Sequence, residues 1–215
     1  MLNKDRIGVL IGKNGETKEL LETLTRTKIV IDSDTGEYTI MAVTEEDKLE
    51  GSTGKRNKII ESLQDSYKEE ISLELNTEDP AFSVWITKKI IRAINMGFKP
   101  EKAVKLLDQN YILDVTNLES VIGHSEKKLR RIKGRIIGEK GKMRMSIEKF
   151  TNTHLSIYRN LIGIIGDYNS MKIAKKAVNM ILDGLPHRVV YNFIQKKYRE
   201  QKEKEFRETW KPTFD

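Results

Sequence analysis

The sequence predicts an α+β protein made of two related tandem modules, each with a small antiparallel sheet packed against helices, plus a charged C-terminal helix. Two observations support this. Two copies of the motif G-x-x-G, at Gly12–Gly15 and Gly138–Gly141, follow an isoleucine and enclose a charged residue. After each motif, the apolar spacing changes from a helical period to short strand-like runs and back again. A chain of 215 residues is long enough for two small domains.

The chain repeats itself at two different offsets. An offset of 126 residues superimposes the two glycine motifs and also aligns Ile11 with Ile137. An offset of 87 residues aligns Trp85–Ile91 with Lys172–Val178. Because the second offset is 39 residues shorter, the first module carries an insertion of about that length in its middle. Two matches in the same order indicate a duplication.

Each module is expected to contain a short helix that ends at the glycine motif, an amphipathic helix, two strands and a closing helix. Gly97 and Gly184 follow the closing helices, where a left-handed cap residue is typical. The expected bounds are Glu16–Thr25, Lys28–Asp32, Glu37–Val43 and Phe82–Met96 in the first module, and Lys142–Thr151, Leu155–Tyr158, Leu161–Ile165 and Ser170–Asp183 in the second.

The two modules differ at their start. The second has a leading strand at Tyr111–Thr116, whereas only six residues precede Ile7 in the first, too few for a full strand. The insertion, 44–79, is expected to hold a loop, a helix and an alternating strand that joins the first sheet, at Gly51–Lys55, Asn57–Tyr67 and Glu70–Leu75. The predicted division is therefore 1–98 for the first module, 99–110 for a linker helix, 111–186 for the second module and 187–215 for the C-terminal helix and tail.

The C-terminal segment from Val189 to Trp210 has the pattern of one long helix. Its apolar stripe is thin, and lysines and arginines alternate with glutamates around it, so a solvated helix is expected. Trp85 and Trp210 are expected to be packing residues.

The net charge of +7 and the pI of about 9.3 favour a polyanionic partner, most simply nucleic acid. The chain has no cysteine, and its three histidines, His124, His154 and His187, are far apart, so neither a metal nor a cofactor is expected. The first residues are too polar for a signal peptide, and no apolar run is long enough to span a membrane, so a cytoplasmic location is expected.

The glycine motifs suggest contact with a sugar-phosphate backbone. Two glycines allow a tight turn without a Cβ in the way, and the helix that follows directs free N–H groups at a phosphate. A plain corner between two helices would also use glycine, but the duplication favours the phosphate site. The residues expected to bind RNA are Arg6, Ile11, Gly12, Lys13, Asn14, Gly15, Lys18, Arg130, Arg131, Lys133, Arg135, Ile137, Gly138, Glu139, Lys140, Gly141, Lys142 and Arg144.

The order strand, helix, G-x-x-G, helix, strand, strand, helix resembles type I KH domains. In that family the glycine loop clamps the backbone of about four single-stranded nucleotides. The stretch Leu129–Gly138 resembles, more closely, the second KH domain of the archaeal and eukaryotic Partner of Nob One family, as do Arg92–Ala103 and Gly184–His187.

That resemblance implies a single-stranded RNA-binding protein of small-subunit assembly that binds 16S rRNA, or its precursor, near the 3′ end. It also implies contact with the Nob-type endonuclease and with an initiation factor subunit. Two features depart from the pattern, the missing first strand and the acidic Glu139 within the second loop.

Two other functions fit the same residues, a general RNA-binding or RNA-decay adaptor and a KH-fold protein–protein scaffold. No catalytic constellation is present, so we do not expect an enzyme. The second module is expected to supply more of the RNA affinity, because more cations surround its loop.

Overall fold

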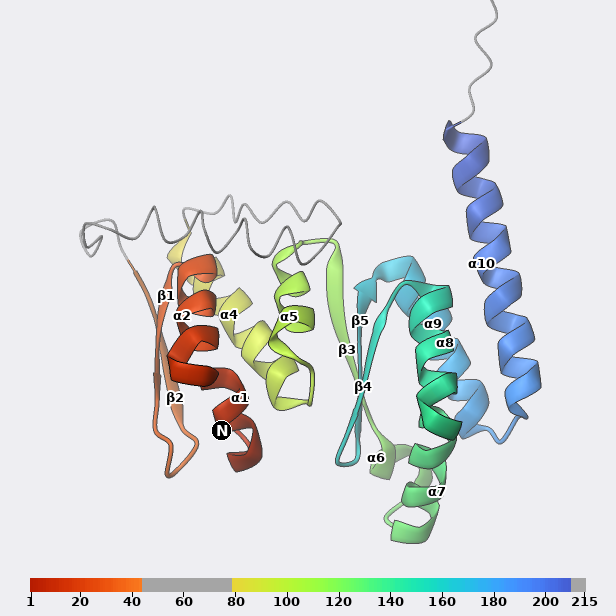
Figure 1. The fold of residues 1–215 in the computed structure, drawn as a ribbon, viewed down its shortest axis with the longest axis horizontal. Helices are drawn as coiled ribbons and strands as arrows, with labels where there is room; N and C mark the ends of the chain where they lie inside the picture. The colour runs from red at the N-terminus through yellow and green to blue at the C-terminus, as the bar shows by residue number, and fades with distance from the viewer. Residues whose placement is uncertain (44–78, 210–215) are drawn as a thin grey trace, which may run out of the picture. The chain divides into compact units, whose positions relative to one another are not determined.

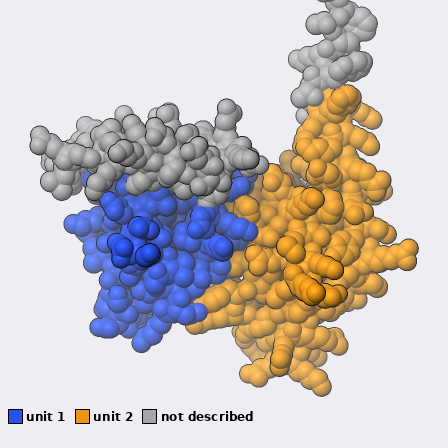
Figure 2. Space-filling model, in the orientation of Figure 1, with its two compact units in different colours: residues 1–113 blue, residues 114–215 orange. Residues whose placement is uncertain are grey.

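The computed structural model describes residues 1–43 and 79–209. The chain divides into two compact units, Met1–Leu113 and Asp114–Asp215 (Figure 2). The loop, helix and strand predicted within 44–78 lie outside the described residues.

In its described residues, the first unit has a two-stranded antiparallel sheet covered by helices on one face (Figure 1). Strands β1 and β2 pair in a register that places Ile29 opposite Ile40. The buried core joins Leu10, Leu21 and Ile90 from three helices. The elements are α1 (Lys4–Ile11), the 3₁₀ turn η1 (Lys13–Gly15), α2 (Glu16–Thr25), β1 (Thr27–Ile31), β2 (Tyr38–Ala42), α4 (Pro80–Asn95), α5 (Pro100–Ala103) and η3 (Val104–Leu107).

No strand precedes α1 in the described part of this unit. The three residues before α1 are fixed in another way. The backbone N–H of Leu2 donates to the carbonyl oxygen of Gly36 at 2.8 Å, and that of Asn3 donates to the side-chain oxygen of Asn95 at 2.7 Å. The segment 99–110, predicted as a linker helix, adds the buried Ala103 and Leu106 to this unit, where α5 and η3 pack on α4.

The second unit has a three-stranded sheet in the order β3-β5-β4, with helices α8 and α9 against it. Its core includes Ile136, Ile147, Ile165 and Ile181, all fully buried. The elements are β3 (Tyr111–Asn117), α6 (Leu118–Ile122), α7 (Glu126–Ile137), the 3₁₀ turn η4 (Glu139–Gly141), α8 (Lys142–Thr151), β4 (His154–Tyr158), β5 (Leu161–Asp167), α9 (Tyr168–Leu182) and α10 (His187–Thr209).

These elements confirm the predicted α+β class with small antiparallel sheets. The bounds of α2 and α8 are those expected from the sequence, and the strands differ from the expected bounds by one or two residues. Gly97 and Gly184 have φ of +89° and +90°, the left-handed conformation expected of residues that end a helix.

The C-terminal helix α10 begins two residues earlier than predicted and is not solvated throughout. Val190 and Ile194 are fully buried, because the first turns of α10 pack against α8 and α9. The expectation of a solvated helix is therefore wrong for the first turns of α10. It is right for residues 202–207, which are exposed. Aromatic side chains of α10 add to this contact, since Tyr198 lies 5.5 Å from Phe150 of α8, and Phe193 lies under the Lys176 ammonium of α9. The sequence of α10 alone cannot reveal the surface that α8 and α9 offer.

Candidate nucleic-acid interface

The two glycine loops have the same backbone conformation. The first glycines, Gly12 and Gly138, have φ/ψ of 76°/178° and 72°/176°, a region open in practice only to glycine. Asn14 and Lys140, two residues later, are left-handed at φ 55° and 50°. The backbone at both loops therefore follows the repeat that the sequence shows.

The first and last glycines of the loops have different structural roles. A Cβ on Gly12 would lie 2.7 Å from the backbone nitrogen of Thr17, and a Cβ on Gly138 would lie 2.9 Å from that of Met143. A Cβ on Gly15 would meet no atom within 4 Å. The first glycine thus lets the next helix approach closely, while the last one has open space in front of it.

Both loops run directly into a helix whose N-cap residue is a glycine, Gly15 for α2 and Gly141 for α8. Glycine has no side chain to accept hydrogen bonds from the first-turn N–H groups. The N–H of Glu16 donates to the carbonyl of Lys13, and that of Lys142 donates to the carbonyl of Glu139. The rest of the first turn has no competing side-chain cap, so the positive end of the helix dipole can attract an anion. The geometry suits a phosphate or another small oxyanion.

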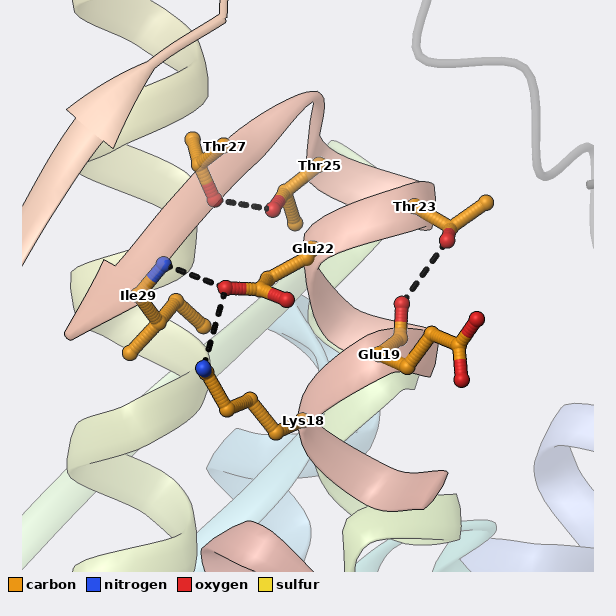
Figure 3. A network of polar contacts seen from close by, with 7 residues as sticks. All are labelled: Lys18, Glu19, Glu22, Thr23, Thr25, Thr27 and Ile29. Atoms are coloured by element: carbon orange, nitrogen blue, oxygen red, sulfur yellow. Dashed lines mark hydrogen bonds and ion pairs between the residues drawn. The ribbon is translucent and has the colours of Figure 1, made fainter. Parts of the chain in front are cut away.

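In each unit, a carboxylate on the helix after the loop contacts the neighbouring edge strand, and Figure 3 shows this contact in the first unit. One oxygen of Glu22 accepts a hydrogen bond from the backbone N–H of Ile29 at 2.6 Å and lies 3.6 Å from the Lys18 ammonium. In the second unit, Glu148 accepts from the N–H of Leu155 at 2.8 Å. Arg144 lies 3.5 Å from the other oxygen of Glu148.

This contact orients the strand that faces the loop. Strand β4 pairs with β5 on one side only, so its amide groups point alternately to β5 and outward. Because the N–H of Leu155 points outward to Glu148, the backbone groups of Ile157 point to the same side. The glycine loop and an outward strand edge therefore flank α8, and these polar backbone groups can hydrogen-bond base edges.

The predicted cations fall into three sets, of which the first is exposed. Arg130 and Arg131 are exposed on α7, and Lys142 is exposed at the start of α8. The tips of both loops are exposed as well, at Lys13, Asn14, Glu139 and Lys140.

The second set consists of cations that bind backbone carbonyls of their own unit. The Arg6 guanidinium donates to the carbonyls of Ile94 and Phe98, at 2.8 and 2.6 Å. Lys133 donates to the carbonyl of Arg159 at 3.1 Å, in the turn between β4 and β5.

Arg135 belongs to the same set. It donates to the carbonyls of Ile181 and Leu185 at 3.0 and 2.6 Å. Arg6, Arg135 and Lys133 therefore hold the ends of helices and strands in place.

The third set, Lys18 and Arg144, pairs with the carboxylates described above. With Glu22 and Glu148 nearby, their charge is partly neutralised. Over the aligned windows, residues 12–22 carry two cations and three carboxylates, whereas residues 138–148 carry three cations and two carboxylates. The second loop is thus the more positive one.

Of the predicted apolar residues, Ile137 is 38% exposed beside the second loop, and Ile11 is half-buried. Sequence reasoning missed Met145, which is 54% exposed on α8 and whose methyl group would lie 3.9 Å from a Cβ on Gly141. The helical phase could have found it, because Met143 and Ile147 are fully buried and residue 145 lies about 200° around the helix from each.

Two other kinds of site are not found in the described residues. Residues 1–43 and 79–209 hold no group of three or more histidine, cysteine or acidic side chains that could bind a metal ion. No helix in the same ranges has both the length and the apolar character needed to cross a bilayer.

Comparison with known proteins first identifies the class. A family model described as a eukaryotic-type KH domain (KH-domain type I) matches residues 112–199, which hold the second loop, both flanking helices and the sheet. The second unit therefore contains a type I KH domain.

The chain belongs to the archaeal Partner of Nob One family. It is 35% identical to the KH domain-containing protein of Methanocaldococcus jannaschii over 99% of this chain and 78% of that protein. It is 31% identical to the pre-rRNA-processing protein pno1 of Aspergillus oryzae, over 53% of this chain and 45% of that one.

Solved structures agree with this assignment. The crystal structure of Dim2p from Pyrococcus horikoshii is 36% identical, with a TM-score of 0.69 over 91% of this chain and 95% of that one. A complex of a/eIF2alpha, aDim2p and rRNA from the same organism contains a chain that is 35% identical, with a TM-score of 0.71 over 93% of this chain and 92% of that one.

Proposed function

We propose that the protein is a single-stranded RNA-binding factor of small ribosomal subunit assembly, which binds 16S rRNA or its precursor near the 3′ end. It acts by binding, not by catalysis. The main observation behind the proposal is the pair of glycine loops with closely similar backbone conformation, each followed by a helix whose N-cap residue is a glycine. The rRNA in the complex with the Pyrococcus relative supports the choice of ligand.

The proposal includes two KH modules in tandem, one in each unit. The first unit supports it through the same order of loop, helix, two strands and helix, and through the matching contacts of Glu22 and Glu148. Its sheet has two described strands instead of three. The charged α10 completes this architecture.

The proposed protein partners are the Nob-type endonuclease and the α subunit of an initiation factor. The first rests on the family and on the pre-rRNA-processing role named for the fungal relative. The second rests on the a/eIF2alpha present in the complex with the Pyrococcus relative.

Binding to a labelled RNA that matches the 3′ end of the small-subunit rRNA tests the function. Affinity should fall with salt with a log–log slope of about −3, as expected if about four phosphates of a single strand are neutralised. The same RNA in a duplex should bind more weakly, because KH domains need unpaired bases.

Three other outcomes would point elsewhere. Equal affinity for unrelated single strands would favour a general RNA-binding or RNA-decay adaptor. A flat salt response would contradict phosphate contacts. The absence of RNA binding would favour a protein–protein scaffold.

A further inference from the structure

Trp85, on the closing helix α4 of the first unit, was expected to be a packing residue, but its side chain is 54% exposed. Its ring lies 5.5 Å from that of Phe82, centroid to centroid. The Lys89 ammonium is 5.1 Å from the centre of the Trp85 ring. Trp85 therefore leaves much of a large aromatic ring in contact with solvent, next to a second aromatic ring.

The same face of α4 carries only positive charge. Lys88 and Arg92 are exposed and follow Trp85 at i+3 and i+7, so the three side chains lie on one side of the helix. Residues 80–95 contain no aspartate or glutamate. In the described part of the chain, no carboxylate lies within ion-pair distance of Lys88 or Arg92. We call Trp85, Lys88 and Arg92 the α4 face.

Lys89 adds a further cation next to the indole. Its ammonium donates a hydrogen bond to the carbonyl of Tyr111 at 3.1 Å, and burial lowers its pKa from the ordinary value. A nearby phosphate would favour the charged form of Lys89 and offset that burial. Lys89 therefore places a third cation of α4 close to the indole ring.

The second unit repeats this feature on its closing helix. Residues 168–182 of α9 also lack acidic side chains, and Lys172, Lys175 and Lys176 align with Trp85, Lys88 and Lys89 at the 87-residue offset. Tyr168 is 58% exposed there, with the Lys172 ammonium 4.3 Å from its ring centre.

The α9 surface is already partly neutralised, unlike the α4 face. Lys175 pairs with Asp114 at 2.7 Å. The shallow hollow beside the α9 lysines also has Asp183 in its lining. The α4 face therefore remains the stronger candidate for an anionic ligand.

We propose that the α4 face is a second contact for single-stranded RNA, with one base stacked on Trp85 and neighbouring phosphates bound by Lys88 and Arg92. Trp85 and Arg92 are separated by about 10 Å along the helix axis, the rise of seven residues, which is the length of a short stretch of strand. Aromatic stacking next to cations is the usual way in which proteins hold single strands without reading their sequence. This inference rests on the proposed function, since it takes RNA as the ligand, and extends it beyond the glycine loops.

Tryptophan fluorescence tests the stacking directly, because Trp85 and Trp210 are the only tryptophans. In the full chain with Trp210→Phe, emission reports Trp85 alone. A labelled single-stranded RNA of about 20 nucleotides, well beyond the four that one KH loop clamps, is titrated while anisotropy and emission are recorded together. We expect the anisotropy to rise and the Trp85 emission to be quenched in the same concentration range.

Substitutions test the contribution of the face to affinity. Trp85→Ala should weaken binding of this RNA about tenfold, in the range for the loss of one base stack, and Trp85→Phe should restore part of it. The pair Lys88→Ala with Arg92→Ala should make the salt slope shallower by about 1.4. The control pair, Lys196→Ala with Arg199→Ala, removes two exposed charges from α10 and should change the slope less. Unchanged circular dichroism verifies the fold of each variant.

The possible outcomes separate the two proposals. A rise in anisotropy without quenching, and with Trp85→Ala as tight as the parent, overturns the α4 face and leaves the glycine loops as the RNA site. If the control pair has the same effect as the α4 pair, the α4 face is likewise excluded, because only overall charge matters. No anisotropy change at all contradicts the proposed function itself. Quenching by an acidic protein but not by RNA assigns the face to a protein partner and overturns the inference.

Discussion

Arg6 and Arg135 make the same contact from different places in the repeat. Each binds two carbonyls at the end of the closing helix of its unit, Ile94 and Phe98 or Ile181 and Leu185, and these carbonyls align at the 87-residue offset. The arginines themselves do not align, because at the 126-residue offset Arg135 matches residue 9, nearly one helical turn after Arg6. A long side chain can reach the same carbonyls from either turn of the helix.

This contact makes Arg135 a stability residue, although it lies in a cluster of cations. Arg135→Ala should destabilise the protein by about 1.5–3 kcal/mol, the usual range for hydrogen bonds from a charged donor. Urea unfolding measures the change, with Arg131→Ala, which removes an exposed charge from the same helix, as the control. Equal midpoints for the two variants would show that the carbonyl contacts contribute nothing.

The glycines of the second loop should differ in their tolerance of a side chain. Gly138→Ala meets the backbone of Met143 and forces an alanine into a glycine-only conformation, so a loss of about 1–3 kcal/mol is expected. Gly141→Ala keeps a left-handed φ of 78° but finds open space, with only the Met145 methyl at 3.9 Å, and should cost about 1 kcal/mol. Thermal unfolding of both variants checks the order, and a larger loss for Gly141→Ala would contradict the assigned tasks.

In both units, a glutamate on the helix after the glycine loop accepts a hydrogen bond from the backbone of an edge strand. Glu22 and Glu148 are the seventh residues of α2 and α8. Each carboxylate accepts a hydrogen bond from a backbone N–H of the strand that follows. This contact satisfies an outward N–H that a second strand would otherwise satisfy, and so protects the edge. The arrangement depends on a helix and a strand joined by a very short connection.

Glu148 is expected to act mainly as a hydrogen-bond acceptor. Glu148→Gln retains an oxygen for the Leu155 N–H and loses only the pairing with Arg144, so its stability should change little. Glu148→Ala leaves the N–H of Leu155 without this acceptor and should cost about 1–2 kcal/mol. Hydrogen exchange at the Leu155 amide, faster in the alanine variant only, is the specific measurement. Equal protection in both variants would refute the edge role.

The whole molecule presents two loops of equal shape and unequal charge. The second is more positive over the aligned windows, and the exposed Arg130 and Arg131 precede it. In the first unit, Glu16 and Glu19 are exposed on the helix after the loop. Phosphate contacts supply most of the sequence-independent binding energy, so the second unit should contribute more to RNA affinity.

Matched loop variants test this imbalance. Glu139→Asp with Lys140→Asp should weaken RNA binding strongly, and Lys13→Asp with Asn14→Asp should weaken it less. Asn14 and Lys140 have left-handed φ, which aspartate tolerates, so both folds should survive. Because Glu139 is already acidic, Lys142→Ala supports the second pair. Arg135 and Arg144 are unsuitable for this purpose, because both make contacts within the second unit. A greater loss from the first pair would reverse the assignment.

The sequence by itself determined much of the molecule. Local and periodic patterns correctly predicted the α+β fold class, the bounds of α2 and α8 and the position of both glycine loops. They could do so because helix periodicity and glycine conformation depend on residues close together in the sequence. The resemblance to the Partner of Nob One family came from short motifs and is confirmed. The predicted strand at Glu70–Leu75 lies outside the described residues and stays a prediction.

Tertiary structure alone decided which predicted side chains remain exposed. Arg6 and Arg135 find their carbonyls 88 to 92 and 46 to 50 residues away, and no local pattern contains such partners. Trp85 is exposed and Val190 is buried for the same kind of reason, since burial depends on which surface another element brings to that place. The spacing of residues sets the face of a helix on which a side chain lies, and the packing of distant segments determines whether that face meets protein or solvent.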